Sequence, residues 1–168
     1  MRTSPRTVAA PLQACRLRLE KAVSADIPDL LRLINGYAAQ GIMLPRTELE
    51  LAENLRDFTV VRENGRVLAC AALHIYSPAS AEIRSLAVEP AAQGRGLGRA
   101  LVLALEQEAR DLGLQTVFAF TYIPDFFRKL GYRQVERSEL PLKAWKDCLR
   151  CPKFQCCDEI PVLKSLSG

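Results

Sequence analysis

Three alternating glycines stand between a predicted strand and a predicted helix, and they constrain the fold more than any other feature of this sequence. The strand ends near Val88, apolar residues recur at helical spacing from Leu97 to Leu112, and the glycines are Gly94, Gly96 and Gly98. Glycine lets a backbone approach a ligand closely, and the first N–H groups of a helix favour a pyrophosphate. Arg95 and Arg99 can add charge-assisted contacts to the same phosphates. The loop is a candidate anion site, although a glycine-rich turn that only joins strand to helix has the same pattern.

The glycine spacing excludes two familiar phosphate-binding loops. The Gly-Lys-Ser/Thr ending of a P-loop is absent, and the glycines do not follow the G-x-G-x-x-G pattern of a dinucleotide fold. The strands before the loop are also predicted to be antiparallel, because Phe58–Glu63 and Arg66–Tyr76 flank the dipeptide Asn64-Gly65, a strong hairpin signal. A nucleotide-binding βαβ unit is therefore not expected.

The remaining periodicities predict strands and helices along the rest of the chain. Besides the hairpin, strands are predicted at 16–20, 82–88, 116–121, 132–135 and 160–166, and helices at 28–40, 47–56, 97–112 and 125–130. Ser24 or Asp26 is expected to cap the first helix, and Thr47 and Glu50 have the spacing of a capping box. The expected fold class is α/β (α+β).

Length and composition fit one compact domain. With 168 residues, 49% of them apolar, the chain can bury about two-thirds of its unfolded surface. We expect residues 1–14 to form a flexible tail and residues 15–168 to form a single domain. No apolar run suits a membrane span and residues 1–12 lack the core of a signal peptide, so a cytoplasmic location is expected. The net charge of +4 is too small and too evenly spread for nucleic-acid binding and fits an anionic small molecule.

Two motifs, in order, resemble those of the GNAT superfamily of N-acetyltransferases. Leu86-x-Val88-x-Pro90 followed by Gln93-Gly94-Arg95-Gly96-Leu97-Gly98 resembles its signature Q/R-x-x-G-x-G/A, and Phe126-Phe127-Arg-Lys-Leu-Gly131-Tyr132 resembles its second motif, F-Y-x-K-x-G-F. The resemblance implies a mixed, mostly antiparallel sheet of six to seven strands flanked by about four to five helices, with acetyl-CoA as co-substrate. It also implies that the strand before the loop splays from its neighbour. The backbone at Leu86, Ala87 and Val88 would pair with the pantetheine arm, and Gln93 to Arg99 would bind the pyrophosphate.

Acetyl transfer to an amine needs a proton acceptor, and an acid assists the departing thiolate. Glu82, at the start of the predicted strand 82–88, is the candidate base, acting directly or through water; the alternative is a solvated carboxylate at a strand end. The family often has a tyrosine as the acid beside the phenylalanine of its second motif, where this chain has Phe127. Thr121 and Tyr122, at the end of the preceding strand, are the hydroxyls that can replace it.

Further segments resemble the acetyltransferase domain of N-acetylglutamate synthases, in the short form without a kinase domain. They are Gly41–Arg46, Cys70–His74, Ala81–Val88, Val117–Thr121 and the stretch from Phe126 to Pro141. The resemblance implies that Arg46 binds an acceptor carboxylate, that Glu82 acts through water and that His74 helps to hold the acceptor. A solvated Arg46 and a hydrogen-bonded core His74 are the alternatives.

The implied reaction is the acetylation of L-glutamate, the opening step of arginine biosynthesis. Glutamate has two carboxylates, and Lys146, Arg150 or Lys153 can contact the second; we predict Lys146, together with Arg84, as substrate contacts. Alternative acceptors are glutamine, another amino acid, a polyamine and a protein amino terminus. A non-catalytic CoA-binding sensor is an alternative of another class, and a homodimer is left open.

The six cysteines are expected to be reduced thiols. Cys70 lies in an apolar run and is expected to be a small buried residue. Four others crowd the C-terminal region: Cys148, Cys151, Cys156 and Cys157. Four thiols can enclose zinc, but neighbouring cysteines rarely share one ion and a second C-x-x-C pair is absent from the sequence. We therefore predict no required metal, and reduced or redox-responsive thiols at this cluster.

Overall fold

The computed structural model describes residues 17–140, 148–153 and 157–167, so the predicted tail at residues 1–14 lies outside the described part. The described residues form seven strands: β1 (Leu17–Lys21), β2 (Phe58–Glu63), β3 (Arg66–Ser77), β4 (Ser80–Val88), β5 (Thr116–Thr121), β6 (Arg133–Gln134) and β7 (Ile160–Ser165). Within the same residues lie four α-helices: α1 (Ile27–Ala38), α2 (Glu48–Glu53), α3 (Leu97–Asp111) and α4 (Pro124–Lys129). Each predicted strand and helix is confirmed, with boundaries shifted by a few residues.

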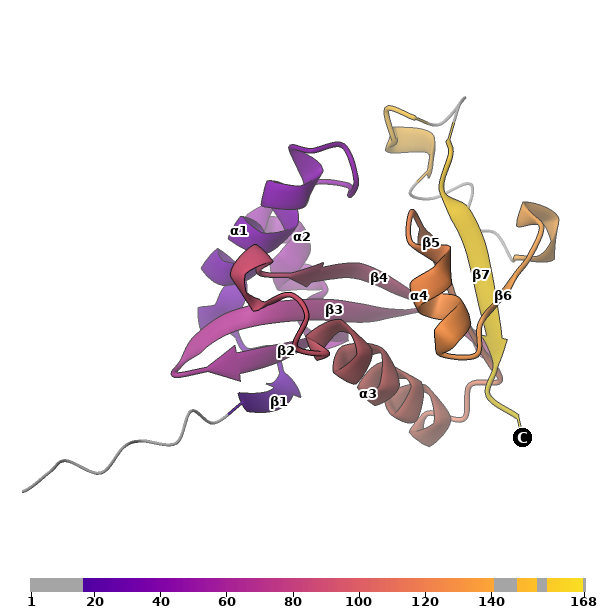
Figure 1. Ribbon diagram of the computed structural model, residues 1–168, viewed down its shortest axis with the longest axis horizontal. Coiled ribbons are helices and arrows are strands. Elements are labelled where there is room, and N and C mark those ends of the chain that lie inside the picture. The colour runs from indigo at the N-terminus through magenta and orange to yellow at the C-terminus, as the bar shows by residue number, and fades with distance from the viewer. Residues whose placement is uncertain (1–16, 141–147, 154–156, 168) are drawn as a thin grey trace, which may run out of the picture.

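The strands form one mixed sheet in the order β1-β2-β3-β4-β5-β7-β6. All neighbouring strands are antiparallel except β4 and β5, which run parallel. A parallel pair needs a crossover connection, and α3 provides it between these two strands. The predicted mixed, mostly antiparallel sheet is therefore confirmed (Figure 1).

The β2–β3 hairpin forms where the dipeptide Asn64-Gly65 predicts it. Both residues have positive φ angles, 51° and 80°, as the two-residue turn of a twisted hairpin requires. The turn pairs Glu63 with Arg66, and a bulge between Val61 and Arg62 then shifts the register so that Val60 pairs with Cys70. The register places one set of alternate side chains of β3 under α1 and α2 and the other set under α3.

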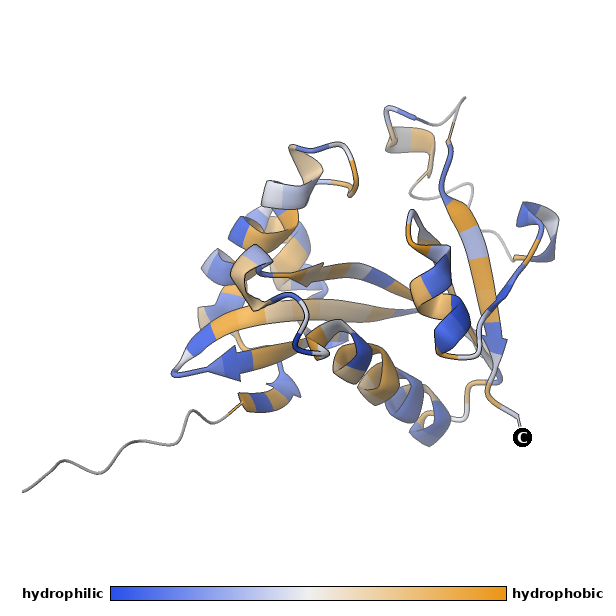
Figure 2. Ribbon diagram, viewed as in Figure 1, coloured by the Kyte–Doolittle hydropathy of each residue, from blue (hydrophilic) through white to orange (hydrophobic). Residues whose placement is uncertain are grey.

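The helices cover both faces of the sheet, with α3 on one face and α1 and α2 on the other (Figure 1). The apolar residues that recur along α3 are all buried: Leu97, Leu101, Leu105 and Ala109. Full burial of one leucine side chain stabilises the fold by about 2 kcal/mol. The middle of β3 is largely apolar, whereas the tip of the β2–β3 hairpin is hydrophilic (Figure 2).

The first two helices begin differently from each other. Thr47 caps α2 as predicted, since its Oγ1 accepts from the Glu50 N–H at 3.2 Å while the Thr47 N–H donates to Glu50 Oε2 at 2.8 Å. Asp26 precedes α1, but its carboxylate does not cap the helix. It accepts instead from the Val23 N–H at 2.8 Å and from Arg62 Nη2 at 2.9 Å. The bonds from Arg62 lower the pKa of the buried Asp26 against the opposing effect of burial.

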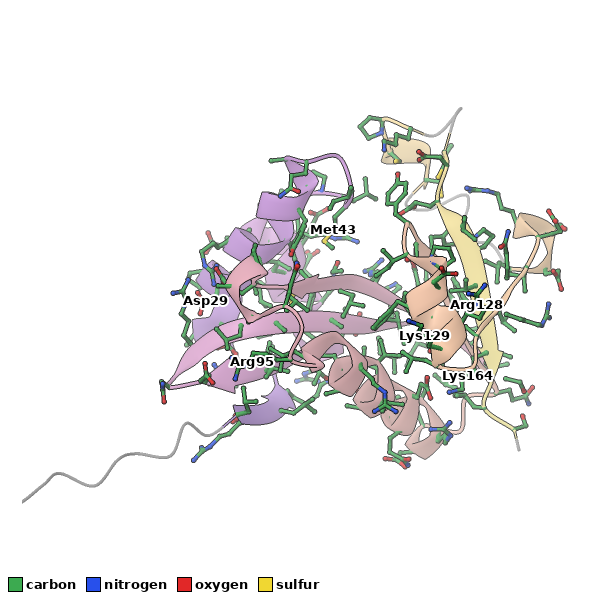
Figure 3. The ribbon with its side chains drawn as sticks, in the orientation of Figure 1. Asp29, Met43, Arg95, Arg128, Lys129 and Lys164 are labelled. Carbon is green, nitrogen blue, oxygen red and sulfur yellow. The ribbon has the colours of Figure 1, made fainter. Side chains whose placement is uncertain are left out.

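A buried ion pair fastens β7 and the end of α4 to α3. Lys164 Nζ lies 2.7 Å from Glu106 Oε2 and donates to the Leu130 carbonyl at 2.7 Å. Figure 3 shows Lys164 on β7 beside α4. Glu106 is only 1% exposed, and burial together with its charge raises the pKa of the neighbouring Tyr132. The bond from Lys164 to the Leu130 carbonyl helps to position α4, whose Phe126 and Phe127 line a cleft beside β4.

Candidate active site

A cleft of about 890 Å³ opens where β4 and β5 separate. β4 forms its floor from Glu82 to Val88. Its sides are the loop after α1, the glycine loop with the start of α3, and the end of β5 with α4. The C-terminal segment around Cys148 and Glu159 completes the lining. The cleft therefore joins most of the segments that the sequence motifs single out.

The separation of β4 from β5 is visible in their register. Only Ser80, Ala81 and Glu82 of β4 pair with β5, opposite Thr116, Val117 and Phe118, and no later pair joins the two strands within the described residues. β4 nevertheless continues to Val88. Its later residues thus turn a strand edge toward the cleft, and an extended ligand can pair with such an edge. The splay implied by the family resemblance is present.

A bulge interrupts β4 inside the cleft. Ser85 has a φ of +54°, which is uncommon for a residue with a side chain, and the register with β3 shifts between Cys70 and Ala72. The Cys70 thiol donates to the Ser85 carbonyl at 3.5 Å, and complete burial raises the pKa of Cys70 to about 12, so the thiol stays protonated. Cys70 is the small buried residue predicted. The bulge itself was not predicted, because serine gives no sequence signal for a positive φ.

The glycine loop has the backbone that an anion site needs. Gly94 and Gly96 have φ angles of +79° and +76°, and Gly96 directly precedes α3. Gly98 has ordinary helical geometry and lies close to Phe126 and Val88, whose nearest atoms are 3.6 and 3.8 Å from the position of an added Cβ. Since the first N–H groups of a helix have no intrahelical acceptor, this end of α3 offers several donors to the cleft.

The two predicted phosphate-binding arginines are placed differently. Arg99 lines the cleft. Arg95 is not among the lining residues and pairs with Glu63 of the β2–β3 hairpin, with Nη2 to Oε1 at 2.8 Å and Nη1 to Oε2 at 3.3 Å (Figure 3). The ion pair holds the loop against the hairpin, and a phosphate contact by Arg95 stays a prediction.

Tyr37 links α1 to the cofactor side of the cleft. Its hydroxyl donates to the Val88 carbonyl at 2.5 Å and accepts from Gln93 Nε2 at 2.9 Å. Gln93, Val88 and Leu86 line the cleft, whereas the side chain of Ala87 is buried under α1; their predicted contacts with the cofactor stay a prediction. Tyr37 was missed by the sequence argument because its spacing on α1 fits a core position equally well.

Glu82 is enclosed rather than solvated. It is the third residue of β4, belongs to the last β4–β5 pair, lines the cleft and is 2% exposed. The predicted alternative, a solvated strand-end carboxylate, is therefore wrong. Arg84, two residues further along β4, lines the same cleft.

His74 lies opposite Glu82 on β3 but is not among the lining residues. Its Nδ1 lies 2.8 Å from Asp57 Oδ2 and 3.3 Å from Arg84 Nη2. One ring nitrogen cannot donate to a carboxylate and accept from a guanidinium at once, so the shorter contact assigns the proton to Nδ1 and the bond to Asp57. The arrangement fits a hydrogen-bonded residue behind the cleft wall, and direct contact with an acceptor stays a prediction.

Arg46 lies in the loop between α1 and α2 and lines the cleft together with Met43 and Leu44. The side-chain amide of Asn35, on α1, holds its backbone: the Arg46 N–H donates to Asn35 Oδ1 at 2.9 Å, and Asn35 Nδ2 donates to the Arg46 carbonyl at 3.0 Å. Arg46 and Glu82 are thus brought into one cleft from segments far apart in sequence. Asn35 was not singled out by the sequence.

Both candidate acids lie at the end of β5. Thr121 is 6% exposed, and its Oγ1 accepts from the Ile123 N–H at 2.9 Å. Tyr122 donates to Asp158 at 2.8 Å and accepts from Lys153 Nζ at 2.9 Å, and burial is the largest cause of its raised pKa. Its hydroxyl therefore fastens the C-terminal segment to β5.

The other predicted contacts fall in or near the C-terminal segment. Lys146, the side chain of Arg150 and Cys156 lie outside the described residues, and Lys153 is engaged with Tyr122. Cys148, Cys151 and Cys157 line the cleft. In the described part of the chain, no three His, Cys, Asp or Glu side chains gather closely enough to hold a metal ion. No helix of that part is long and apolar enough to cross a membrane.

Comparison with known proteins points to one family. The model described as Acetyltransferase (GNAT) family matches residues 27–132. An uncharacterised N-acetyltransferase of Chlorobaculum tepidum is 41% identical over 142 residues, which cover 84% of this chain and 92% of that protein. An amino-acid acetyltransferase of Mycobacterium tuberculosis is 34% identical over 139 residues, covering 81% of this chain and 79% of the relative.

Solved structures agree with these sequence matches. N-acetylglutamate synthase from Neisseria gonorrhoeae, complexed with coenzyme A and N-acetyl-glutamate, has a TM-score of 0.83 and 27% identity, covering 93% of this chain but 36% of that one. A Mycobacterium tuberculosis protein in complex with CoA has a TM-score of 0.77 and 30% identity, covering 88% and 98%. The family match includes β4, the glycine loop and α4, which enclose the cleft, so this chain belongs to the GNAT family of acetyltransferases and is an acyltransferase enzyme.

Proposed function

We propose that this protein transfers the acetyl group of acetyl-CoA to the α-amine of L-glutamate, giving N-acetyl-L-glutamate, the opening step of arginine biosynthesis in the cytoplasm. The observation that carries the proposal is the enclosed carboxylate of Glu82 at the point where β4 and β5 part, in one cleft with Arg46. The amino-acid acetyltransferase and N-acetylglutamate synthase relatives support this acceptor.

Acetyl-CoA fits the cleft through two features of the backbone. The N–H groups at the glycine loop and the start of α3 would bind the pyrophosphate, aided by Arg99. The free edge of β4 would pair with the pantetheine arm as an added strand does, at Leu86 to Val88. This pairing directs the thioester toward Glu82, and a β4 N–H would polarise its carbonyl.

Glu82 would act as the general base. The neutral amine attacks the carbonyl carbon of the thioester, a C–N bond forms, and the proton that the amine loses passes to Glu82 directly or through water. The C–S bond then breaks and coenzyme A leaves as its thiolate. Enclosure of Glu82 from solvent strengthens its electrostatic interactions with the reacting groups.

Thr121 is better placed than Tyr122 to assist the thiolate. The Thr121 oxygen is fixed by the Ile123 N–H, so its own proton can be directed toward the cleft. Tyr122, by contrast, already donates its proton to Asp158 and accepts from Lys153, so its hydroxyl is engaged away from the thioester. We therefore assign the leaving-group contact to Thr121.

Arg46 would select an acceptor with a carboxylate. A guanidinium is planar and binds a carboxylate through two parallel hydrogen bonds, and Arg84 supplies a second positive charge to the same cleft. Glutamate has two carboxylates and uses both charges. Glutamine has one and a polyamine has none, so the same two arginines favour glutamate over either.

An acceptor screen tests the proposal. Thiol release from acetyl-CoA is followed with glutamate, glutamine, other amino acids and polyamines, and we expect glutamate to give the highest kcat/KM. Arg46→Ala should raise the KM for glutamate at least about tenfold, with partial recovery in Arg46→Lys, while acetyl-CoA affinity stays near the parent's. Glu82→Gln should lower kcat roughly a hundredfold or more. A parent that prefers a polyamine, or variants that match the parent on glutamate, would refute the proposal.

A further inference from the structure

We propose that Asn35 is the positioning residue that sets Arg46 for the acceptor carboxylate, an inference that rests on the proposed function. Both polar atoms of the Asn35 side chain form hydrogen bonds with the backbone of one residue, Arg46, in the loop after α1. Its carbonyl oxygen accepts from the Arg46 N–H at 2.9 Å, and its Nδ2 donates to the Arg46 carbonyl at 3.0 Å. These two bonds fix the backbone on both sides of the Arg46 Cα.

The segment that Asn35 holds has no regular structure of its own. Residues 39–47 form turns and extended backbone between α1 and α2, so no helix or strand ladder orients Arg46. Thr47, the next residue, is fixed by its capping box with Glu50. The Asn35 clamp and this cap together fix the backbone of two successive residues, Arg46 and Thr47.

Asn35 stands on a rigid base. Its helical neighbours Leu33 and Ile34 are 3% and 0% exposed and pack in the core under the sheet. Because Asn35 is held by the packed core, its two hydrogen bonds fix the Arg46 backbone, from which the guanidinium extends, relative to that core. Groups held in place before binding lose less freedom when the ligand arrives, and this raises affinity without any new contact.

Only an amide of this length meets both requirements of the loop. Aspartate can accept from the Arg46 N–H but cannot donate to the Arg46 carbonyl, and alanine does neither. Two residues along α1, Tyr37 holds the Val88 carbonyl instead. Helix α1 therefore contacts the proposed acceptor site through Asn35 and the proposed cofactor site through Tyr37. Variants of Asn35 should weaken the binding of glutamate, and variants of Tyr37 should weaken the binding of coenzyme A.

Steady-state kinetics with L-glutamate, paired with calorimetric binding of coenzyme A, test the inference. Asn35→Ala should raise the KM for glutamate about tenfold, by misplacing Arg46, and leave the dissociation constant for coenzyme A within about twofold of the parent. Asn35→Asp should fall between, since it keeps one of the two bonds. Tyr37→Phe should show the reverse pattern. Gln40→Ala, which removes an exposed amide just after the end of the same helix, is the matched control and should behave as the parent.

The double variant Asn35→Ala/Arg46→Ala separates positioning from a general structural role. If Asn35 acts through Arg46, its replacement should change the KM little once Arg46 is gone. An equal effect in both backgrounds, or a lower melting temperature with an unchanged KM, would overturn the inference. These outcomes differ from failure of the proposed function: a parent that acetylates glutamate with unaffected Asn35 variants refutes only the inference, and a parent that acetylates only amines without a carboxylate refutes both.

Discussion

Alanine at Gly96 and alanine at Gly98 add the same methyl group to the glycine loop, but we expect only the change at Gly96 to lower stability or coenzyme A affinity. Gly96 has a φ of +76°, which an L side chain rarely adopts, and alanine in that conformation is strained by about 1–2 kcal/mol. Gly98 has no positive φ, and its added Cβ would meet Phe126 and Val88 at ordinary contact distances of 3.6 to 3.9 Å. Gly98→Ala should therefore be close to neutral, within about 0.5 kcal/mol.

The strain at Gly96 can appear in either of two measurements. If the loop keeps its conformation, the strain lowers the free energy of unfolding; if the loop relaxes, restoring it on binding weakens coenzyme A. The loss of unfolding free energy and the loss of binding free energy should sum to about 1–2 kcal/mol. If the whole loss falls on binding, the dissociation constant for coenzyme A rises roughly five- to thirtyfold. Denaturant unfolding gives the first quantity and isothermal titration with coenzyme A gives the second. A Gly96→Ala variant equal to the parent in both measurements would refute the argument that this loop requires a positive φ at Gly96, and an equal loss in Gly98→Ala would show that side-chain volume, not backbone conformation, is limiting.

Three further predictions follow from the described contacts. Tyr122→Phe should lower kcat less than about threefold and Thr121→Val more than about tenfold in the same assay, because the Tyr122 proton is committed to Asp158. Asp26→Asn should lower the free energy of unfolding by about 2 kcal/mol at pH 7. Since the folded pKa of Asp26 is lowered, the parent's advantage is present above the unfolded value near 4 and is lost as pH falls through the folded value, so melting temperatures should converge in acid. Glu106→Gln should cost roughly 3 kcal/mol by denaturant unfolding, and the double change with Lys164→Met should cost less, because both buried charges are then removed.

Local patterns were enough to predict the strands and helices. Asn64-Gly65 required a turn with two positive φ angles, and the apolar spacing along α3 required one buried face; both are present. The backbone of the glycine loop could be predicted for a related reason, since glycine best suits the φ angles at Gly94 and Gly96. Such signals are encoded within a few residues and do not depend on distant parts of the chain.

Two of the features that sequence could not predict depend on which side chains meet in the folded chain. Arg95 is predicted to contact the phosphates, but the sequence does not indicate that Glu63 on the neighbouring hairpin also pairs with its guanidinium. Asn35 looks like an ordinary helix residue until Arg46, 11 positions later, is seen to share both of its polar atoms. A single sequence does not reveal which side chains of different segments form hydrogen bonds or ion pairs with one another.

The orientation of Glu82 follows from the burial pattern of its own strand. Its neighbours Ala81 and Ile83 are buried in the cluster beneath α3, at 0% and 3% exposure, so the alternation of a strand turns Glu82 to the opposite face. Shifting the register of β4 by one residue would place the carboxylate under α3 and expose Ile83. The apolar contacts that fix the register of β4 therefore also hold Glu82, the candidate base, in the cleft. Glu82 belongs to the last residue pair between β4 and β5. For this reason a polar residue at Ile83, which also lines the cleft, should disturb catalysis as well as folding.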